Sequence, residues 1–578
     1  MPHSTVDTFI RVISIISMLF LSGPSPLVVH AAQAYGQSSY HTSSGQVDES
    51  LQTANEQTSQ EGTPTPEPTS EINPQSDSGA NNTYYFPLIF KSDDLVTTST
   101  SFVICNYTIP LTDNIADGRT NYAGVSPGDV VCLEPGNRGS LTLQNFTGTP
   151  EQPIIFINDG EQLVITADFN SVGLSIKNSQ HFHLTGTGSN DTYGIKIKGQ
   201  SSATVGHGLR IGWRSEEFEV DHLEITNIPG IGVSAQTNPT CQDGSGGHSY
   251  DYDGDGDKDS ADATYRGLFV QHNAKFHDNY LHNIGTEAFY VGSSFYLTGL
   301  DVECDSGTES RLPHTLSGVA IYNNIIDGTD WDALQVGSAV EGCFVYGNQI
   351  FDDSRIEHPN QAAGIHMNPG SSCHIYNNYI EGGKGPGMHL NSGGGNVVYN
   401  NIIVDAGLGA STSEHGIHVG IVDSDGSEEM QIFNNTIIRP TNRGINFNSN
   451  SPAPNSFVYN NLIVDPGSDY INATGGVQVC SDCNYTTNDI SSVDFVDPNN
   501  NDYSLEASSP AIDIGVYPSL ISTDYNNKPR GQGNGYDAGA HEYGSATLIT
   551  SFQSSSGTPL GQTTIFTNVS SGTDLTYV

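Results

Sequence analysis

The sequence has 578 residues, more than one compact domain normally uses, and therefore predicts two or three structural units. It contains 19 lysines and arginines against 64 aspartates and glutamates, a formal net charge of −45, and this excludes nucleic acids and anionic membrane surfaces as partners because polyanions are repelled. Only 14% of the residues are charged while 64 are glycine, a composition that favours short strands joined by turns over long charged helices.

The first 34 residues are predicted to be a secretory signal peptide. His3 and Arg11 precede an apolar stretch at 12–21, and residues 32–34 read Ala-Gln-Ala, a small-x-small cleavage site. We therefore expect a protein that is secreted or held at the cell surface and does not insert into a membrane after cleavage. In such an oxidising compartment the eight cysteines are disulfide candidates before they are metal ligands.

Residues 35–100 are predicted to form a disordered linker. They are rich in Ser, Thr, Gln and Pro, and residues 63–71 read TPTPEPTSE. So few aliphatic side chains cannot bury enough apolar surface to offset the entropy cost of ordering the chain.

From residue 101 to 545 a phrase of six residues recurs: an apolar residue, a polar pair or aromatic-polar pair, an asparagine, and two strand formers. Ile375-Tyr-Asn-Asn-Tyr-Ile is one example. A period in the low twenties, stretched by loops, is typical of a solenoid, and we interpret the single gap of 45 as two turns. The last asparagine of each phrase falls at residues 279, 324, 348, 378, 401, 435 and 461.

The residues that flank these asparagines are Val, Ile, Tyr and Phe, and no helical apolar period connects the repeats. Each repeat is therefore predicted to be one coil of short strands, and stacked coils give long parallel sheets around an apolar core. Asparagine suits the bend of a coil because it tolerates left-handed backbone angles and its amide can bond the same amide one coil away. We interpret the repeated asparagines as structural.

Both ends of this region resemble one family. Residues 125–136, Val-Ser-Pro-Gly-Asp-Val-Val-Cys-Leu-Glu-Pro-Gly, and the segment 148–155 resemble the opening coils of the right-handed parallel β-helix family of pectate-lyase-like secreted bacterial proteins, and the segments 502–513 and 537–543 resemble their ending. The resemblance implies an all-β, right-handed parallel β-helix (solenoid) over residues 101–545. It implies no single activity, since the fold hosts lyases, glycosidases, epimerases and non-catalytic fibres.

A second recurring phrase, of which Gly364-Ile-His-Met is one example, alternates with the asparagine bends. Side chains alternate along a strand, so the third residue of each phrase is predicted to point outward and to stack at about 4.8 Å spacing on neighbouring coils. We expect this outward row to line an extended sugar chain; the alternative is a solvated sheet face with tolerated polar residues. The row is Ser234, Tyr290, Gln335, His366, His389, His418 and Asn446.

Titratable side chains in and beside the row are the predicted catalytic groups. Histidine titrates near pH 6.5 and commonly transfers protons, and paired carboxylates do acid and base work on glycosidic bonds. A lyase would also need a cation beside the uronate carboxylate, for which Arg210, Arg214, Arg266 and Lys275 are the nearby candidates. The predicted catalytic residues are Tyr290, His366, His389, His418, Glu287 and Asp332, with Ser234, Gln335 and Asn446 binding the substrate.

The segment 251–262, Asp-Tyr-Asp-Gly-Asp-Gly-Asp-Lys-Asp-Ser-Ala-Asp, has the oxygen-ligand spacing of a calcium loop. It resembles EF-hand, dockerin and thrombospondin-type loops, with Gly256 at loop position 6. We expect calcium with a structural role; the alternative is an acidic, solvated loop. The predicted ligands are Asp251, Asp253, Asp255, Asp257, Asp259 and Asp262, at loop positions 1, 3, 5, 7, 9 and 12.

The cysteines fit four disulfides. Cys343 and Cys373 each lie five residues before the asparagine of consecutive repeats and hence stack within reach of a disulfide. Cys241 and Cys304 lie in loops on either side of the acidic segment, and Cys105 with Cys132 and Cys480 with Cys483 complete the set. A zinc site at Cys480 and Cys483 is the alternative for that pair, but no second such pair accompanies it.

Residues 546–578 resemble the first strands of a polycystic-kidney-disease (PKD) type β-sandwich; the alternative is a flexible tail. Together these features predict a monomeric, polysaccharide-binding, carbohydrate-active β-helix protein, a polysaccharide lyase or glycoside hydrolase, with a structural calcium loop. The alternative is a non-catalytic module for adhesion or the cell surface.

Overall fold

The computed structural model describes residues 104–167, 172–200, 206–392, 395–409, 414–420, 429–448, 455–517 and 521–544, with two short strands nearer the C-terminus. The chain divides into two units, Met1–Ser101 and Phe102–Val578, and the second contains all the described residues. The predicted signal peptide and linker lie outside them. Within these ranges no helix has the length and apolar character needed to cross a membrane.

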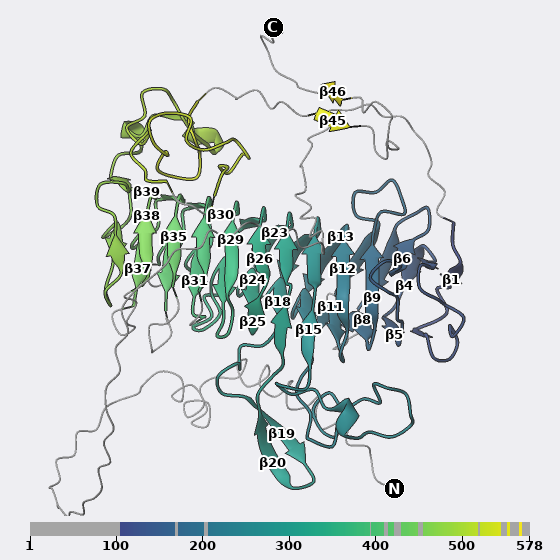
Figure 1. Ribbon diagram of the computed structural model, residues 1–578. Helices are drawn as coiled ribbons and strands as arrows, with labels where there is room; N and C mark the ends of the chain where they lie inside the picture. Colours follow the sequence, from purple (N-terminus) through teal and green to yellow (C-terminus); the bar gives the residue numbers. More distant parts are fainter. Residues whose placement is uncertain are drawn as a thin grey trace, which may run out of the picture. The chain divides into compact units, whose positions relative to one another are not determined.

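Three parallel sheets run through the second unit, and the chain adds one strand to each of them in every regular coil (Figure 1). Sheet 1 contains β1 (Tyr107–Ile109), β3 (Val130–Leu133), β6 (Ile154–Asn158), β9 (Gln180–Thr185), β12 (Glu216–Asp221), β16 (Ala274–His277), β22 (Ala320–Tyr322), β26 (Cys343–Tyr346), β29 (Cys373–Tyr376), β32 (Val397–Tyr399), β35 (Gln431–Phe433), β38 (Phe457–Tyr459) and β41 (Gln478–Val479).

Sheet 2 contains β4 (Gly136–Arg138), β7 (Leu163–Thr166), β10 (Ile195–Lys198), β13 (Leu223–Ile228), β17 (Tyr280–Ile284), β23 (Ile325–Thr329), β27 (Gln349–Phe351), β30 (Tyr379–Glu381), β33 (Ile402–Val404), β36 (Thr436–Ile438), β39 (Leu462–Val464) and β42 (Tyr485–Thr487). Sheet 3 contains β2 (Ile115–Asp117), β5 (Leu141–Gln144), β8 (Val172–Lys177), β11 (His207–Gly212), β14 (Val233–Ala235), β18 (Phe289–Val291), β24 (Leu334–Val336), β28 (Ile365–Met367), β31 (Met388–Leu390), β34 (Ile417–Val419), β37 (Ile445–Phe447) and β40 (Ile471–Asn472).

Smaller elements accompany the coils. A three-stranded parallel sheet joins β15 (Val270–His272), β21 (Thr315–Ser317) and β25 (Ala339–Glu341). Three antiparallel pairs join β19 (Leu300–Cys304) to β20 (Gly307–Arg311), β43 (Phe495–Asp497) to β44 (Asp502–Leu505), and β45 (Phe552–Ser554) to β46 (Phe566–Asn568). The 3₁₀ turns are η2 (Ser260–Asp262), η3 (Ile490–Ser492) and η4 (Pro498–Asn500). The PKD-like assignment of the tail stays a prediction, since most of residues 546–578 lie outside the described ranges.

One apolar core lies between the three sheets, because alternate residues of every short strand point inward. Phenylalanines from successive coils of sheet 1 continue through this core, from Phe156 through Phe182 and Phe218 to Phe276, with neighbouring ring centroids 5.4–6.3 Å apart. The stacked coils form a parallel β-helix, as the repeat predicts.

A ladder of asparagines runs between sheets 1 and 2. The amide nitrogen of each repeated asparagine donates to the side-chain oxygen of the corresponding asparagine one coil further on, at 2.9–3.1 Å. These bonds confirm the predicted stacking of amides and extend it by one residue that lies outside the sequence phrase, Asn484. The ladder is Asn279, Asn324, Asn348, Asn378, Asn401, Asn435, Asn461 and Asn484.

The two properties that suit asparagine to the bend belong to different residues. The ladder asparagines are buried and hydrogen-bonded, whereas the residue before most of them carries the left-handed backbone conformation, with φ near +55°. Asn323, Asn377, Asn400, Asn434 and Asn460 take this second role.

The interpretation of the 45-residue gap as two turns is wrong. Asn279 donates directly to Asn324, and β16 and β17 pair directly with β22 and β23, so the gap is one coil with an insertion. The β19–β20 hairpin lies in that insertion, and the preceding coil carries the predicted calcium loop in another. Sequence spacing alone cannot separate a second turn from a long loop.

All four predicted disulfides are present, and they pair every cysteine of the described residues. Cys343 and Cys373 lie opposite each other on β26 and β29 and link two adjacent coils. Cys241 and Cys304 join the two insertions.

The segments 490–517 and 521–543 pack against the outer faces of the last coils. Their apolar side chains, such as Phe495 and Tyr503, cover outward residues of sheet 2, and Ile521 and Tyr536 pack on Phe433 of sheet 1.

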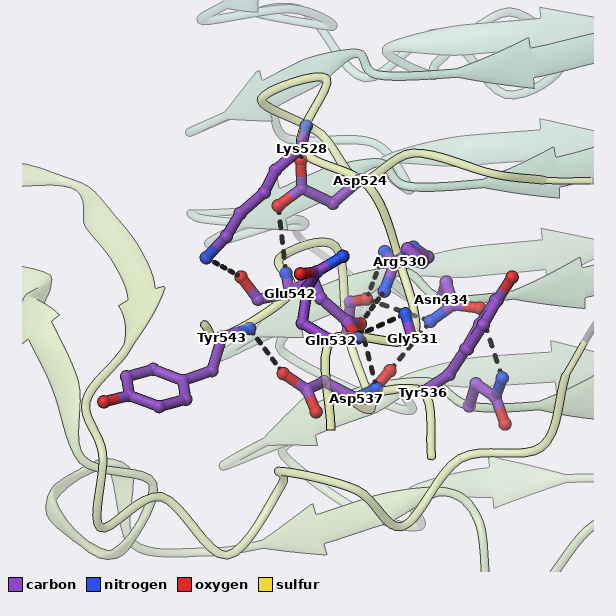
Figure 2. Close-up of polar contacts among 12 residues, drawn as sticks. Asn434, Asp524, Lys528, Arg530, Gly531, Gln532, Tyr536, Asp537, Glu542 and Tyr543 are labelled. Carbon is purple, nitrogen blue, oxygen red and sulfur yellow. Dashed lines mark hydrogen bonds and ion pairs between the residues drawn. The ribbon is translucent and has the colours of Figure 1, made fainter. Parts of the chain in front are cut away.

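Buried polar bonds complete this attachment (Figure 2). Arg530 is buried with Glu542, and its guanidinium donates to Asn400 Oδ1 at 2.7 Å. Glu542 accepts from the backbone N–H groups of residues 531 and 532 at 2.7 and 3.0 Å, while Asn434 donates to the Asp537 carbonyl at 2.9 Å.

We predict that Asn378→Ala lowers the free energy of unfolding by about 2–4 kcal/mol, because it leaves buried donors and acceptors of the neighbouring ladder amides without partners. Asn377→Gly is the matched control: residue 377 has φ +55°, a conformation that glycine adopts without strain. Chemical denaturation of both variants tests the ladder. Equal losses for the two would contradict its special role.

Candidate functional site

The predicted outward row of the third sheet is aligned across seven strands. Parallel pairing places Ser234, Tyr290 and Gln335 opposite one another on β14, β18 and β24. The same register continues through His366, His389, His418 and Asn446 on β28, β31, β34 and β37. The predicted alignment is confirmed.

The expected exposure of this row is wrong for several members. Ser234 and Gln335 are each 1% exposed, His366 is 3% and Asn446 is 6%, whereas Tyr290, His389 and His418 are half-buried. Row members cover one another at the strand spacing: the His366 and His389 rings stack with centroids 4.6 Å apart. The row is therefore not a solvated face.

Burial also changes the acid–base chemistry expected of the histidines. It lowers the pKa of His415 and His418 to about 4, aided at His415 by the His418 and Arg443 charges. Burial and the neighbouring imidazoles lower the pKa of His389 well below its usual range. These three rings are neutral at pH 7, so they serve as hydrogen-bonding groups there rather than as residues that titrate near pH 6.5.

Three buried carboxyl groups lie beside the row, in the connections from sheet 2 strands to sheet 3 strands. Glu287 is 2% exposed and precedes β18, while Asp332 is fully buried and precedes β24. Asp353, which is 1% exposed, lies between β27 and β28. Sequence reasoning missed Asp353 because it follows a sheet 2 strand and belongs to neither recurring phrase.

These carboxyl groups affect one another's ionisation. Burial raises the pKa of Glu287 to about 7, and the nearby Asp332 carboxylate adds to the rise. Burial likewise raises the pKa of Asp353 to about 7, a rise that Asp332 increases and a hydrogen bond from Ser354 opposes. Two carboxyl groups that are half-protonated near pH 7 therefore flank a third, an arrangement found where acid and base must act together.

Asp332 also orients a histidine. His366 Nδ1 lies 2.9 Å from Asp332 Oδ2, and both side chains are buried. Four buried atoms of this group have no hydrogen-bond partner among the described residues: Glu287 Oε2, Asp332 Oδ1, Asp353 Oδ2 and His366 Nε2. We define Glu287, Asp332, Asp353 and His366 as the carboxyl cluster.

The basic residues considered for a lyase lie elsewhere. Arg210 bonds His248 at 2.6 Å, Arg214 donates to the Ala263 carbonyl at 2.6 Å, and Arg266 donates to the Tyr296 carbonyl at 2.6 Å. Arg210 and Arg214 hold the first insertion against the coils, whereas Arg266 joins the first insertion to the second. Lys275 lies on sheet 1 beside Glu219. In the described part of the chain no arginine or lysine bonds a carboxylate of the carboxyl cluster.

The acidic segment brings together part of the predicted ligand set. Carboxylate oxygens of Asp251, Asp253 and Asp255 lie within 4.8 Å of one another, and Gly256 has φ +99°, as the sharp turn at loop position 6 requires. The carboxylate of Asp262 is buried and accepts from the Tyr252 and Asp259 N–H groups at 2.7 and 3.2 Å. Asp259 accepts from the Ala261 N–H, and Asp257 is exposed.

Comparison with known proteins agrees with the fold. Residues 315–490 match the family model described as "Right handed beta helix region". Together with the three parallel sheets, this match confirms the predicted all-β, right-handed parallel β-helix. Among curated proteins the sequence has no match.

Several solved structures are similar to this chain at low identity. The pectate lyase Pel9A is 12% identical with a TM-score of 0.34, over 77% of this chain and 98% of its own. The alginate lyase from Paenibacillus sp. str. FPU-7 is 15% identical with a TM-score of 0.30, over 66% and 99%. The GH136 lacto-N-biosidase from Eubacterium ramulus is 13% identical with a TM-score of 0.39, over 66% and 67%.

We predict that Glu287→Gln removes a pH-dependent loss of stability. The pKa of Glu287 rises from 4.5 to about 7 on folding, so the native state binds more protons than the unfolded state between these values, and stability falls as pH rises through this window. Relative to the unsubstituted protein, the variant should gain on the order of 3 kcal/mol between pH 4 and pH 8. Glu506→Gln, at an exposed position, is the control.

Denaturation at several pH values measures this difference. A Glu287→Gln curve that runs parallel to that of the unsubstituted protein would contradict the assignment of Glu287 as a buried, proton-holding carboxyl group.

Proposed function

We propose that the protein is a secreted, carbohydrate-active enzyme that hydrolyses glycosidic bonds of an extracellular polysaccharide at the carboxyl cluster. The observation that carries this proposal is the presence of two buried carboxyl groups with pKa values of about 7 beside a third, Asp332. The signal-like N-terminus and four disulfides support secretion.

Hydrolysis needs one carboxyl group that holds a proton and one that does not. Glu287, whose raised pKa lets it hold a proton near pH 7, is suited to donate to the leaving glycosidic oxygen, while Asp332 is proposed to act on the sugar as base or nucleophile. His366, hydrogen-bonded to Asp332, positions that carboxylate. Because Asp332 is fully buried, a substrate contacts it only after neighbouring side chains move.

The length and polarity of the row favour a polymer as substrate. The half-buried members of the row run from Tyr290 to His418, four strand steps of about 4.8 Å or roughly 19 Å, which accommodates several sugar units. Amide, hydroxyl and imidazole groups that are neutral at pH 7 suit sugar hydroxyls. With a net charge of −45 and no cation bonded to the carboxyl cluster in the described residues, the substrate is proposed to be uncharged.

A lyase is the second candidate, and the Asp332–His366 pair is what favours it. If the carboxylate holds the proton on Nδ1, the unpartnered Nε2 can accept a proton from a sugar carbon next to a carboxylate. The cation that such a reaction needs to neutralise the sugar carboxylate would have to come from outside the carboxyl cluster.

A non-catalytic binding module remains the alternative, in which the half-buried Tyr290, His389 and His418 contact a sugar chain without cleaving it. Its expected signature is saturable binding without products. In each of these proposals the protein acts as a monomer on a polysaccharide.

Calcium is proposed to occupy the acidic segment. Asp251, Asp253 and Asp255 supply converging carboxylates, Asp257 its backbone carbonyl, and Asp259 and Asp262 the remaining positions of the loop. The segment is joined to the coils by Arg119, which donates to the backbone carbonyls of Asp251 and Tyr252 at 2.8 and 2.5 Å. The ion would therefore stiffen an insertion that is already anchored to the β-helix.

We predict that the purified protein releases reducing ends from a neutral polysaccharide in a panel that also includes uronate polymers. Asp332→Asn and Glu287→Gln should each lower the rate by about 100-fold or more, since each removes a proton-transfer group. Asp330→Asn is the matched control, because Asp330 is ion-paired with Arg355 and lies outside the carboxyl cluster.

The products distinguish the candidates. Reducing ends without ultraviolet absorption support hydrolysis. Reducing ends together with a new ultraviolet-absorbing double bond would show that the enzyme is a lyase and not a hydrolase. Binding without products across the panel would favour the non-catalytic module. A rate that both carboxyl substitutions leave unchanged would remove the carboxyl cluster from the active site.

We predict that Asp251→Ala combined with Asp255→Ala lowers the melting temperature only when calcium is present. The substitutions remove two ligands and otherwise only bonds from backbone N–H groups within the exposed loop itself. Thermal unfolding with calcium and with excess chelator measures this. An equal loss in both conditions would refute the metal assignment and leave the acidic segment as a solvated loop.

A further inference from the structure

A second group of histidines and carboxylates lies on the outer face of sheet 1, away from the carboxyl cluster. Glu219 and Asp221 both point outward from β12 because they are two residues apart on one strand. On the flanking strands, His183 of β9 pairs opposite Glu219, and His277 of β16 pairs opposite Asp221. A central strand therefore presents two carboxylates with an imidazole on each side.

The ligand atoms of these four side chains converge. Those of His183, Glu219 and Asp221 lie within 4.8 Å of one another, and His183 Nε2 contacts Asp221 Oδ2. His277 Nε2 lies 2.9 Å from Glu219 Oε1 and 3.9 Å from Asp221 Oδ2. Four ligands placed about 2.1 Å from a tetrahedral Zn²⁺ ion lie about 3.4 Å apart, so small side-chain movements would accommodate the ion.

In His277 and Asp221, the polar atom that does not face the other ligands is hydrogen-bonded to a neighbouring residue. His277 Nδ1 lies 2.7 Å from Asp278 Oδ2, which fixes the ring with Nε2 toward the other ligands. Asp221 Oδ1 accepts from Thr185 Oγ at 2.6 Å and lies 2.6 Å from His222 Nδ1, which leaves Oδ2 facing the centre. Such outer hydrogen bonds are a regular feature of protein metal sites.

We propose that His183, Glu219, Asp221 and His277 bind a divalent transition metal, for which Zn²⁺ is the best match. Two imidazoles with two carboxylates favour zinc over calcium or magnesium, which prefer sites made of oxygen alone. Four side-chain ligands complete a tetrahedron, the arrangement of structural zinc sites. The ion would link β9, β12 and β16, which belong to three consecutive coils. The long insertion that carries the predicted calcium loop lies between the second and the third of these strands in the sequence.

The site borders a groove of about 340 Å³ on the same face, lined in part by Thr149, Pro150, His181, Asn273 and Lys275. Asp221 and His277 have 4% and 12% of their side chains exposed, whereas His183 and Glu219 have 29% and 36% exposed toward solvent. An ion can therefore enter without unfolding of the coils.

Cobalt is the probe, because four-coordinate Co²⁺ has intense visible absorption. The protein is prepared without a histidine tag, stripped with chelator, and carries Asp251→Asn and Asp255→Asn so that the acidic segment does not compete. We expect one equivalent of Co²⁺ to bind with a four-coordinate spectrum, Zn²⁺ to displace it, and either metal to raise the melting temperature.

His183→Gln and His277→Gln should each lower Co²⁺ affinity on the order of 100-fold and abolish the thermal shift. His374→Gln, an imidazole on the same face of sheet 1 but outside the site, should change neither. Circular dichroism and the metal-free melting temperature verify that each variant is folded. Unchanged cobalt binding in both folded variants, or no binding by the parent protein, would overturn the proposal.

Discussion

The hydrogen bond between asparagine amides of consecutive coils is the constraint on which the arrangement of this protein depends. Each ladder amide, such as that of Asn378, both donates to and accepts from its neighbours, so a coil that slipped by one residue would leave buried polar groups without partners. The ladder thereby holds the register of the coils from Asn279 to Asn484. His366 and Glu287, which belong to different coils, share one site because of it.

Much of this architecture follows from the sequence, since the Asn-containing phrase and the strand alternation are local patterns. They locate the ladder and the alignment of Tyr290 with His418. They do not reveal that His366 is buried, because burial depends on side chains from other coils. The sequence does not single out Asp353, His183 and His277 for a related reason. Asp353 and His183 lie outside both recurring phrases, and His277 is one of the variable polar residues of the phrase at 276–281. Only the coiling of the chain brings these residues to their partners.

Negative charge is accommodated in three different ways along one chain. In the carboxyl cluster, burial favours the protonated forms of Glu287 and Asp353. On sheet 1, imidazoles lie beside Glu219 and Asp221. In the acidic segment, backbone N–H groups donate to carboxylates such as those of Asp251 and Asp259, and the remaining carboxylate oxygens are in contact with water. An acidic protein can therefore keep several carboxylates close together without one common countercharge.

The covalent link between adjacent coils has a mechanical consequence. Hydrogen bonds between stacked strands lie along the axis of the β-helix. A force that pulls the coils apart along this axis would therefore detach one coil at a time from the end of the stack. The bond between Cys343 and Cys373 joins β26 to β29 in the middle of the stack. Peeling from the C-terminal end would halt there until the sulfur–sulfur bond was reduced.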